Sequence, residues 1–153
     1  MLMKLEKTMG FYDYNRLGDI LFIFHKNHKK FFNDELSKYD LNLIQAFCIF
    51  MLYRNDELNQ KALSDDLYLT KGAITKAVTK LERDNWISRE RSLEDKRNYV
   101  LKLTEKGKDF IPILSEINGG WEAQMGLNEL DPEFMETFKE LAFKSIDLNL
   151  KKE

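Results

Sequence analysis

The hydrophobic period of this chain changes partway along its length, and that change constrains the fold more than any other feature of the sequence. Along most of the 153 residues, apolar side chains recur every three or four positions, which is typical of amphipathic helices. Over Ile87–Arg91 and Tyr99–Leu103 apolar and polar residues alternate instead, as they do in strands. The charged residues 92–98 lie between these segments and predict a β-hairpin with a polar tip.

Helices are expected on both sides of this hairpin. The chain has two prolines and seven glycines, so turn residues are few and long helices are favoured. The spacing of apolar residues predicts helices at 14–39, 41–54, 59–67 and 71–84 before the hairpin, and from 105 to about 118 and from 132 to the C-terminus after it.

Capping residues mark several of these boundaries. We expect Asp40 to cap the helix at 41–54, Thr70 to cap the helix at 71–84, and Thr104 to cap the helix that follows the hairpin. Asn85 is a suitable left-handed terminator, and Pro132 suits the first position of the last helix. Gly119-Gly120 is expected to bend or interrupt the helix that Thr104 begins.

The order of elements predicts a mainly α fold with a small β-hairpin. Two short helices joined by a turn and followed by a hairpin describe a winged helix-turn-helix, with long helices flanking it. An isolated hairpin is only marginally stable in water, so this one must pack against the neighbouring helices. The helix at 41–54 is apolar nearly all round and should form the centre of the core.

Composition excludes several classes of protein. The most apolar stretch, residues 43–53, is shorter than the roughly 20 residues that span a bilayer, so we expect no contact with a membrane. The single cysteine, Cys48, excludes an internal disulfide, and with no secretory pattern near the N-terminus this predicts a cytoplasmic protein. Cys48 lies in the most apolar predicted helix, where burial rather than redox sensing is expected.

An enzyme is not expected either. The sequence has no phosphate-binding glycine loop, no His-rich metal motif and no nucleophile elbow, so we predict no catalytic residues, no cofactor and no metal. His25 and His28 lie three positions apart on the first predicted helix, a spacing that could bring them to one face. With only two histidines in the chain, packing is favoured over zinc binding.

Charge is distributed unevenly, although the formal net charge is only −2. Residues 71–106 contain ten basic and six acidic side chains, a local charge of +4, whereas the rest of the chain carries −6. Nucleic-acid affinity depends on the local surface and not on the net charge of the chain. The basic segment therefore indicates a phosphate-binding surface, with an ordinary solvated face as the alternative.

The helix at 71–84 carries a polar, cationic ridge opposite its apolar stripe. At 100° per residue, Gly72, Lys76, Thr79 and Arg83 line up, with Thr75 beside them. Lysine and threonine reach phosphates and base edges, and glycine allows a close approach at the positive end of the helix dipole. The hairpin tip carries a second basic group, in residues 96 and 97, which suits the minor groove of DNA.

Residues 58–107 resemble the DNA-binding core of the MarR (multiple antibiotic resistance regulator) family. The matching segments are LTKGAITKAVTKLERDNWISRE at 69–90 and SLEDKRNYVLKLTEKG at 92–107. The more specific part is the wing, in which Asp-x-Arg is followed by Leu-Thr-x-x-Gly. Asn85-Trp86 departs from the family pattern, in which a Gly-Leu type pair is usual.

The resemblance implies a sequence-specific transcriptional regulator, a repressor that binds a pseudo-palindromic operator in double-stranded DNA as a homodimer and that a small aromatic or anionic effector releases. Residues 1–40 and 108–153 would form the dimerisation helices, and residues 41–107 the DNA-binding domain. Arg97 would enter the minor groove with Asp95 orienting it. The full set of expected DNA-binding residues is Thr70, Lys71, Gly72, Thr75, Lys76, Thr79, Lys80, Arg83, Asp95, Lys96 and Arg97.

One alternative remains open from the residues themselves. A winged helix can also serve as a protein–protein interaction module without DNA binding. A protein-docking surface has no need of a basic tip and a basic ridge, so these two features favour the DNA-binding interpretation.

Overall fold

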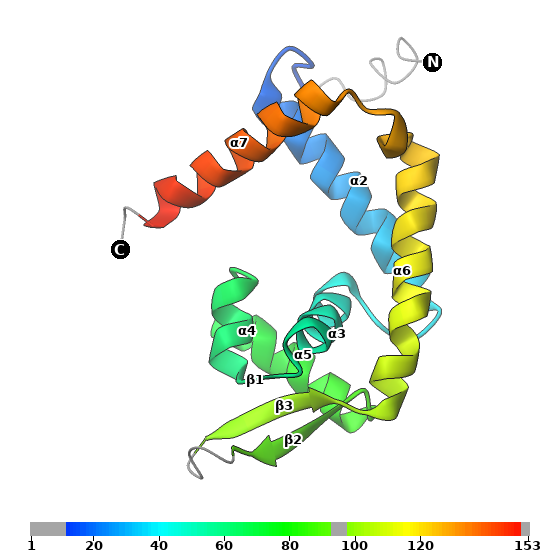
Figure 1. The fold of residues 1–153 in the computed structure, drawn as a ribbon, viewed down its shortest axis with the longest axis vertical. Helices are drawn as coiled ribbons and strands as arrows, with labels where there is room; N and C mark the ends of the chain where they lie inside the picture. The colour runs from blue at the N-terminus through cyan, green and yellow to red at the C-terminus, as the bar shows by residue number, and fades with distance from the viewer. Residues whose placement is uncertain (1–11, 93–97, 151–153) are drawn as a thin grey trace. The chain divides into compact units, whose positions relative to one another are not determined.

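The computed structural model describes residues 12–92 and 98–150 of the chain (Figure 1). Within them, most residues are helical and one small sheet is present, which confirms the predicted fold class. The elements in order are α2 (Leu17–Ser37), α3 (Leu43–Asn55), β1 (Glu57–Leu58), α4 (Gln60–Asp66), α5 (Lys71–Arg83), β2 (Ile87–Arg91), β3 (Tyr99–Leu103), α6 (Glu105–Met125), the 3-10 turn η1 (Leu127–Glu129) and α7 (Pro132–Leu150). Among these helices none is both long enough and apolar enough to span a membrane.

The sheet has three antiparallel strands in the order β1-β3-β2, one more than the sequence predicted. Strands β2 and β3 occupy the predicted ranges and pair from Ile87 opposite Leu103 to Arg91 opposite Tyr99. The additional strand, β1, is only two residues long, so it is too short to show an alternating pattern. It supports the hairpin on its second edge, which a two-stranded ribbon would leave unpaired.

The start of α3 differs from the prediction. The helix begins at Leu43, and its N-cap is Asn42 and not Asp40. The Asn42 side chain accepts a hydrogen bond from the Gln45 amide at 3.0 Å, and the Gln45 side chain accepts one from the Asn42 amide at 2.9 Å. This reciprocal capping box satisfies two amides at once, which a cap at Asp40 could not do. Asp40 instead closes α2, with a left-handed φ of 56°.

The glycine pair in α6 does not interrupt the helix. α6 continues through Gly119 and Gly120 to Met125 and ends before Gly126, whose φ is 67°. A glycine inside a helix costs only about 1 kcal/mol relative to alanine. The cost of two glycines is smaller than the stabilisation from cooperative hydrogen bonding in a helix that continues on both sides of them.

The hydrophobic core lies in the first of two compact units, residues 1–114. As predicted, α3 contributes the most to it, and its Cys48 and Ile49 are completely buried. The neighbouring helices and strands add the fully buried side chains Leu36, Leu63, Ile74, Val78, Leu81 and Leu101.

The second unit, residues 115–153, buries none of its described side chains within the chain. Its helix α7 begins at Pro132, as predicted, and exposes a series of large apolar side chains: Phe134, Met135, Phe138, Leu141, Phe143, Ile146 and Leu148. In the first unit, the N-terminal part of α2 likewise exposes Leu17, Ile20, Leu21, Phe22 and Phe24. Exposed apolar surface of this extent is typical of helices that pack against another molecule.

Candidate nucleic-acid interface

Helix α5 is oriented by its cap and by its apolar stripe, both as the sequence predicted. The Thr70 hydroxyl accepts a hydrogen bond from the Ala73 amide at 3.2 Å and so begins the helix. The side chains that α5 buries are Ile74, Ala77, Val78 and Leu81. Because these occupy one face, the opposite face is directed to solvent.

The outward face of α5 is polar and cationic at its N-terminal end. Lys71, Gly72, Thr75, Lys76 and Thr79 are all exposed. Over the described parts of the chain, the ammonium groups of Lys71 and Lys76 make no hydrogen bond and no ion pair, so both are available to an external anion. A side chain at Gly72 would meet nothing within 4 Å, so packing within the chain does not require glycine there.

The Thr75 hydroxyl has a second role that the sequence did not show. It donates to the Lys71 carbonyl at 2.8 Å and accepts from the Gln60 side chain at 2.6 Å. Gln60 is the first residue of α4, so this bond joins the two helices of the helix-turn-helix at their N-terminal ends. No periodicity identifies Gln60, because its partner lies 15 positions away. A cleft lies beside the bond, lined by Gln60, Lys61, Ser64, Asp65 and Lys71.

Lys80 and Arg83, also on α5, are held within the chain. The Lys80 ammonium lies 2.6 Å from an Asp40 carboxylate oxygen and 2.8 Å from one of Asp84. The Arg83 guanidinium lies 2.8 Å from the other Asp84 oxygen. Hydrogen bonds to Asp40 and Asp84 raise the pKa of Lys80, whereas those from Arg83 and Lys80 hold the pKa of Asp84 well below its usual range.

The base of the wing is held by charged side chains. The Lys102 ammonium lies 3.2 Å from Glu57 and 3.1 Å from Glu90, so it joins all three strands. The Arg91 guanidinium lies over the ring of Tyr99, 5.9 Å from its centroid. The expected tip residues Asp95, Lys96 and Arg97 lie outside the described residues, and their roles stay predictions.

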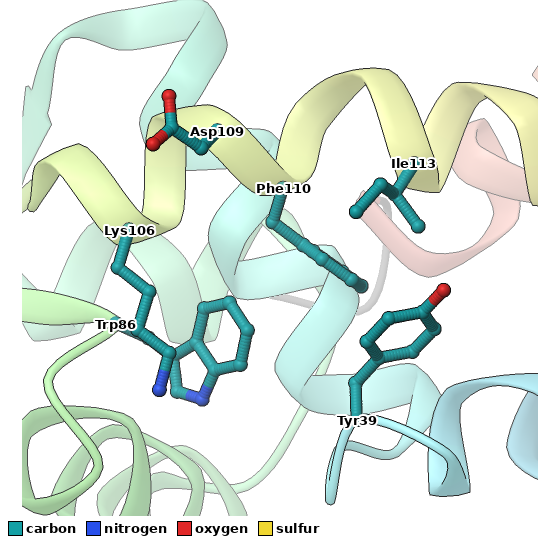
Figure 2. A pocket seen from close by; sticks show the side chains of 6 residues that line it. All are labelled: Tyr39, Trp86, Lys106, Asp109, Phe110 and Ile113. Carbon is teal, nitrogen blue, oxygen red and sulfur yellow. The ribbon is translucent and has the colours of Figure 1, made fainter.

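A shallow cavity of about 390 Å³, largely open to solvent, lies near the C-terminal end of α5 (Figure 2). Its aromatic wall is formed by the ring of Phe110, which lies edge-on to Tyr39 at 5.0 Å and to Trp86 at 5.1 Å between ring centroids. The Lys106 ammonium lies 4.0 Å from the centre of the Trp86 ring and donates to the Asp84 carbonyl at 2.8 Å. Three separate segments form this cavity, so the sequence alone could not identify it.

The cysteine and the histidines form no visible site. Cys48 is completely buried, and this burial raises the pKa of its thiol to about 12. Burial and the neighbouring His25 lower the pKa of His28. In the part of the chain that the structure describes, no group of three potential metal ligands comes together.

Comparison with known sequences supports the resemblance. A model of the MarR family matches residues 41–99. The HTH-type transcriptional regulator SarZ of Staphylococcus epidermidis is 32% identical over 102 residues, which are 65% of this chain and 69% of SarZ. SarZ of Staphylococcus aureus is 34% identical over 103 residues, with the same coverage of 65% and 69%.

Comparison with solved structures supports the fold. The crystal structure of a MarR transcriptional regulator from Methanosarcina mazei Go1 has a TM-score of 0.74 and 26% identity, and the match covers 90% of this chain and 98% of that one. The S. aureus MepR–DNA complex has a TM-score of 0.77 over 86% of this chain and 95% of that one; at 21% identity, this likeness concerns the fold alone.

Proposed function

This chain belongs to the MarR family of transcriptional regulators, and we propose that it binds operator DNA through the outward face of α5 and through the wing. The observation that carries the proposal is the pair of ammonium groups of Lys71 and Lys76 at the N-terminal end of α5, which have no partner among residues 12–92 and 98–150. The positive end of a helix dipole adds to their charge, so this end of α5 suits a phosphate backbone.

The solved structures of the same fold support this choice of partner. They include MepR in complex with DNA, a MarR variant from E. coli complexed with operator DNA, and reduced AbfR bound to DNA. In our proposal, Gly72, Thr75, Lys76 and Thr79 face the major groove, and the wing residues Lys96 and Arg97 reach the minor groove, with Asp95 orienting Arg97. Thr70 acts through its cap, which holds the first turn of α5 in position.

We further propose that the protein works as a homodimer. The apolar side chains that α7 and the N-terminal part of α2 expose would be buried between two copies, with residues 1–40 and 108–153 as the dimerisation region and 41–107 as the DNA-binding domain. A symmetric dimer carries two copies of α5 and therefore reads two half-sites about one helical turn, ~34 Å, apart. Bound across a promoter, such a dimer represses transcription.

The cavity of Figure 2 suits the proposed small aromatic effector. Tyr39, Trp86 and Phe110 supply aromatic walls, and Lys106 supplies a positive charge for an anionic group. Trp86, which lines the cavity, donates its amide to the Leu81 carbonyl in the last turns of α5, so a ligand there would act directly on the DNA-binding helix. Protein docking without DNA is the weaker alternative, since it gives no role to two exposed lysines on one helix.

A gel shift with the DNA upstream of the protein's own gene tests the proposal. We expect a complex that forms at low salt, weakens steeply as salt is added, and contains two copies of the chain per duplex. Retention on heparin should fall in the same salt range. Absence of any complex with DNA at low salt would favour the protein-docking alternative.

A further inference from the structure

We propose that Lys80 is a positioning residue, whose ammonium group holds the C-terminal end of α5 against the turn between α2 and α3. This inference rests on the proposed function, because the helix that Lys80 would position is the one proposed to contact DNA. It changes the role of Lys80 from the DNA contact that the sequence predicted to an internal link.

The geometry of the Lys80 ammonium supports this role. It donates to the Asp40 carbonyl at 2.7 Å, to the Asp40 carboxylate at 2.6 Å and to the Asp84 carboxylate at 2.8 Å. An ammonium group has three protons to donate, so these three bonds use its whole capacity. The side chain is only 26% exposed, whereas Lys71 and Lys76 are open to solvent.

The ends of α2 and α5 are built alike, and Lys80 bonds to groups at both. α2 ends with left-handed Asp40 and a hydrogen bond from the Leu41 amide to the Leu36 carbonyl at 3.1 Å. α5 ends with left-handed Asn85 and the equivalent bond, from the Trp86 amide to the Leu81 carbonyl at 2.8 Å. The C-terminal ends of helices carry partial negative charge, so the cation is stabilised at both.

The link connects two helices that both pack against a third. α2 and α5 both pack against α3, so small shifts of each on α3 would change the angle at which α5 is presented. The bond from Lys80 to Asp40 spans 40 positions of sequence and limits that angle directly. The direction of Lys71 and Lys76 toward a phosphate backbone then depends on the Asp40–Lys80 pair.

The decisive variant is Asp40→Gly, because the loss of its charge and the loss of its bond to Lys80 predict opposite changes in the affinity for DNA. Glycine tolerates the left-handed conformation of position 40, so the variant removes the carboxylate without straining the turn. Loss of a negative charge near DNA would by itself strengthen binding. If Lys80 positions α5, affinity for a labelled duplex from upstream of the gene should instead fall about three- to tenfold.

Asp56→Gly is the matched control. Asp56 also has a positive φ of 56°, and its carboxylate makes no hydrogen bond or ion pair with any described residue, although its charge acts at longer range on Lys108. The change in net charge and in backbone freedom is therefore the same as at position 40. We expect Asp56→Gly to bind the duplex as tightly as the wild type or slightly more tightly.

The salt dependence of binding separates positioning from phosphate contact. Lys80→Met should weaken binding as much as Asp40→Gly while the slope of log K against log salt keeps its wild-type value. Lys76→Ala, measured alongside, should lower that slope by ~1. Lys80→Arg, which can still bond to both carboxylates, should restore most of the affinity. The double variant Asp40→Gly/Lys80→Met should be no weaker than either single one, because both remove one shared interaction.

Three results would overturn the inference. The first is that Asp40→Gly binds DNA as tightly as the wild type or more tightly. The second is that Lys80→Met lowers the slope of log K against log salt by ~1. The third is that the losses of affinity in the two single variants add in the double variant. Titration at stoichiometric concentrations gives the folded, active fraction of each variant, so a folding defect is not counted as lost affinity. Failure of the wild type to bind any duplex would instead overturn the proposed function, and the positioning role with it.

Discussion

A β-carbon added to Gly107 would lie 2.4 Å from the carbonyl oxygen of Trp86, closer than any carbon approaches an oxygen without a covalent bond. That carbonyl already accepts from the Thr104 amide at 3.2 Å and from the Thr104 hydroxyl at 3.1 Å. The Thr104 hydroxyl in turn accepts from the Gly107 amide at 3.2 Å. The first turn of α6 is thereby held against the entry to β2, and the Thr-x-x-Gly spacing of the wing has a structural cause.

Gly107→Ala should lower the free energy of unfolding by about 1–3 kcal/mol, because backbone must move to admit the methyl group. Gly119→Ala is the matched control on the same helix, where a β-carbon meets nothing within 4 Å. That variant should gain up to about 1 kcal/mol from helix propensity. Urea unfolding measures the free energy of unfolding of both variants. Equal gains in stability would show that the close approach of Gly107 to the Trp86 carbonyl does not exclude a methyl group.

Lys76→Ala should weaken DNA binding and reduce the salt slope by ~1 if the ammonium meets a phosphate. Fluorescence anisotropy over a salt series measures both quantities. Lys139→Ala removes the same charge from α7, where the lysine pairs with Glu136, and should leave the slope unchanged. A normal slope for Lys76→Ala combined with altered sequence preference would identify Lys76 as a base reader.

Arg97→Ala should weaken operator binding with little effect on thermal stability, because the proposed role of this side chain is in the minor groove. Gel shifts over a range of salt, together with the melting temperature, separate the two effects. Arg91→Ala, at the base of the wing, removes the same charge from a side chain that lies over Tyr99 and serves as the control. Operator affinity that is unchanged in Arg97→Ala would remove the wing tip from the proposed interface.

Phe143→Asp should convert a dimer to a monomer. The side chain is 65% exposed on α7 and is proposed to be buried between two copies. Light scattering after size-exclusion chromatography gives the mass directly. Tyr53→Asp places the same charge at another exposed aromatic position, on α3 in the proposed DNA-binding domain, and should remain dimeric. A wild-type chain that is monomeric at working concentrations would contradict the dimer proposal outright.

The Cys48 thiol should react with a disulfide reagent only after unfolding, because the reactive thiolate is nearly absent at neutral pH. Burial raises the folded-state pKa to about 12, so the folded chain holds the proton more tightly than the unfolded chain. The contribution of the thiol to the free energy of unfolding has its full value below the pKa that the thiol has in the unfolded chain. It is lost as the pH rises toward 12. Unfolding free energies of the wild type and Cys48→Ala between pH 8 and pH 11 should therefore converge. Rapid labelling of the native protein would show that the thiol is accessible.

Much of the fold could be predicted because its signals lie within a few residues of one another. The Thr70 cap acts three residues ahead, the stripe from Ile74 to Leu81 repeats within α5, and the alternation of β2 and β3 is visible inside each strand. The cap of α3 could also have been predicted, because Asn42 and Gln45 have the spacing of a capping box. Asp40 competes with Asn42 as a capping residue, which is why the prediction was wrong.

The remaining features depend on contacts between residues that lie far apart in the sequence. Strand β1 exists because Leu58 pairs with Leu101, and the cavity exists because Tyr39, Trp86 and Phe110 meet. The sequence by itself determined that α5 carries a cationic face, since one helical period sets which side chains share that face. Only the tertiary structure decided which of those cations remain available. The Lys76 ammonium makes no hydrogen bond or ion pair with any described residue, whereas the Lys80 ammonium bonds to an aspartate 40 positions away. Helical periodicity gives the direction of a side chain, but the partner that it meets depends on how the whole chain packs.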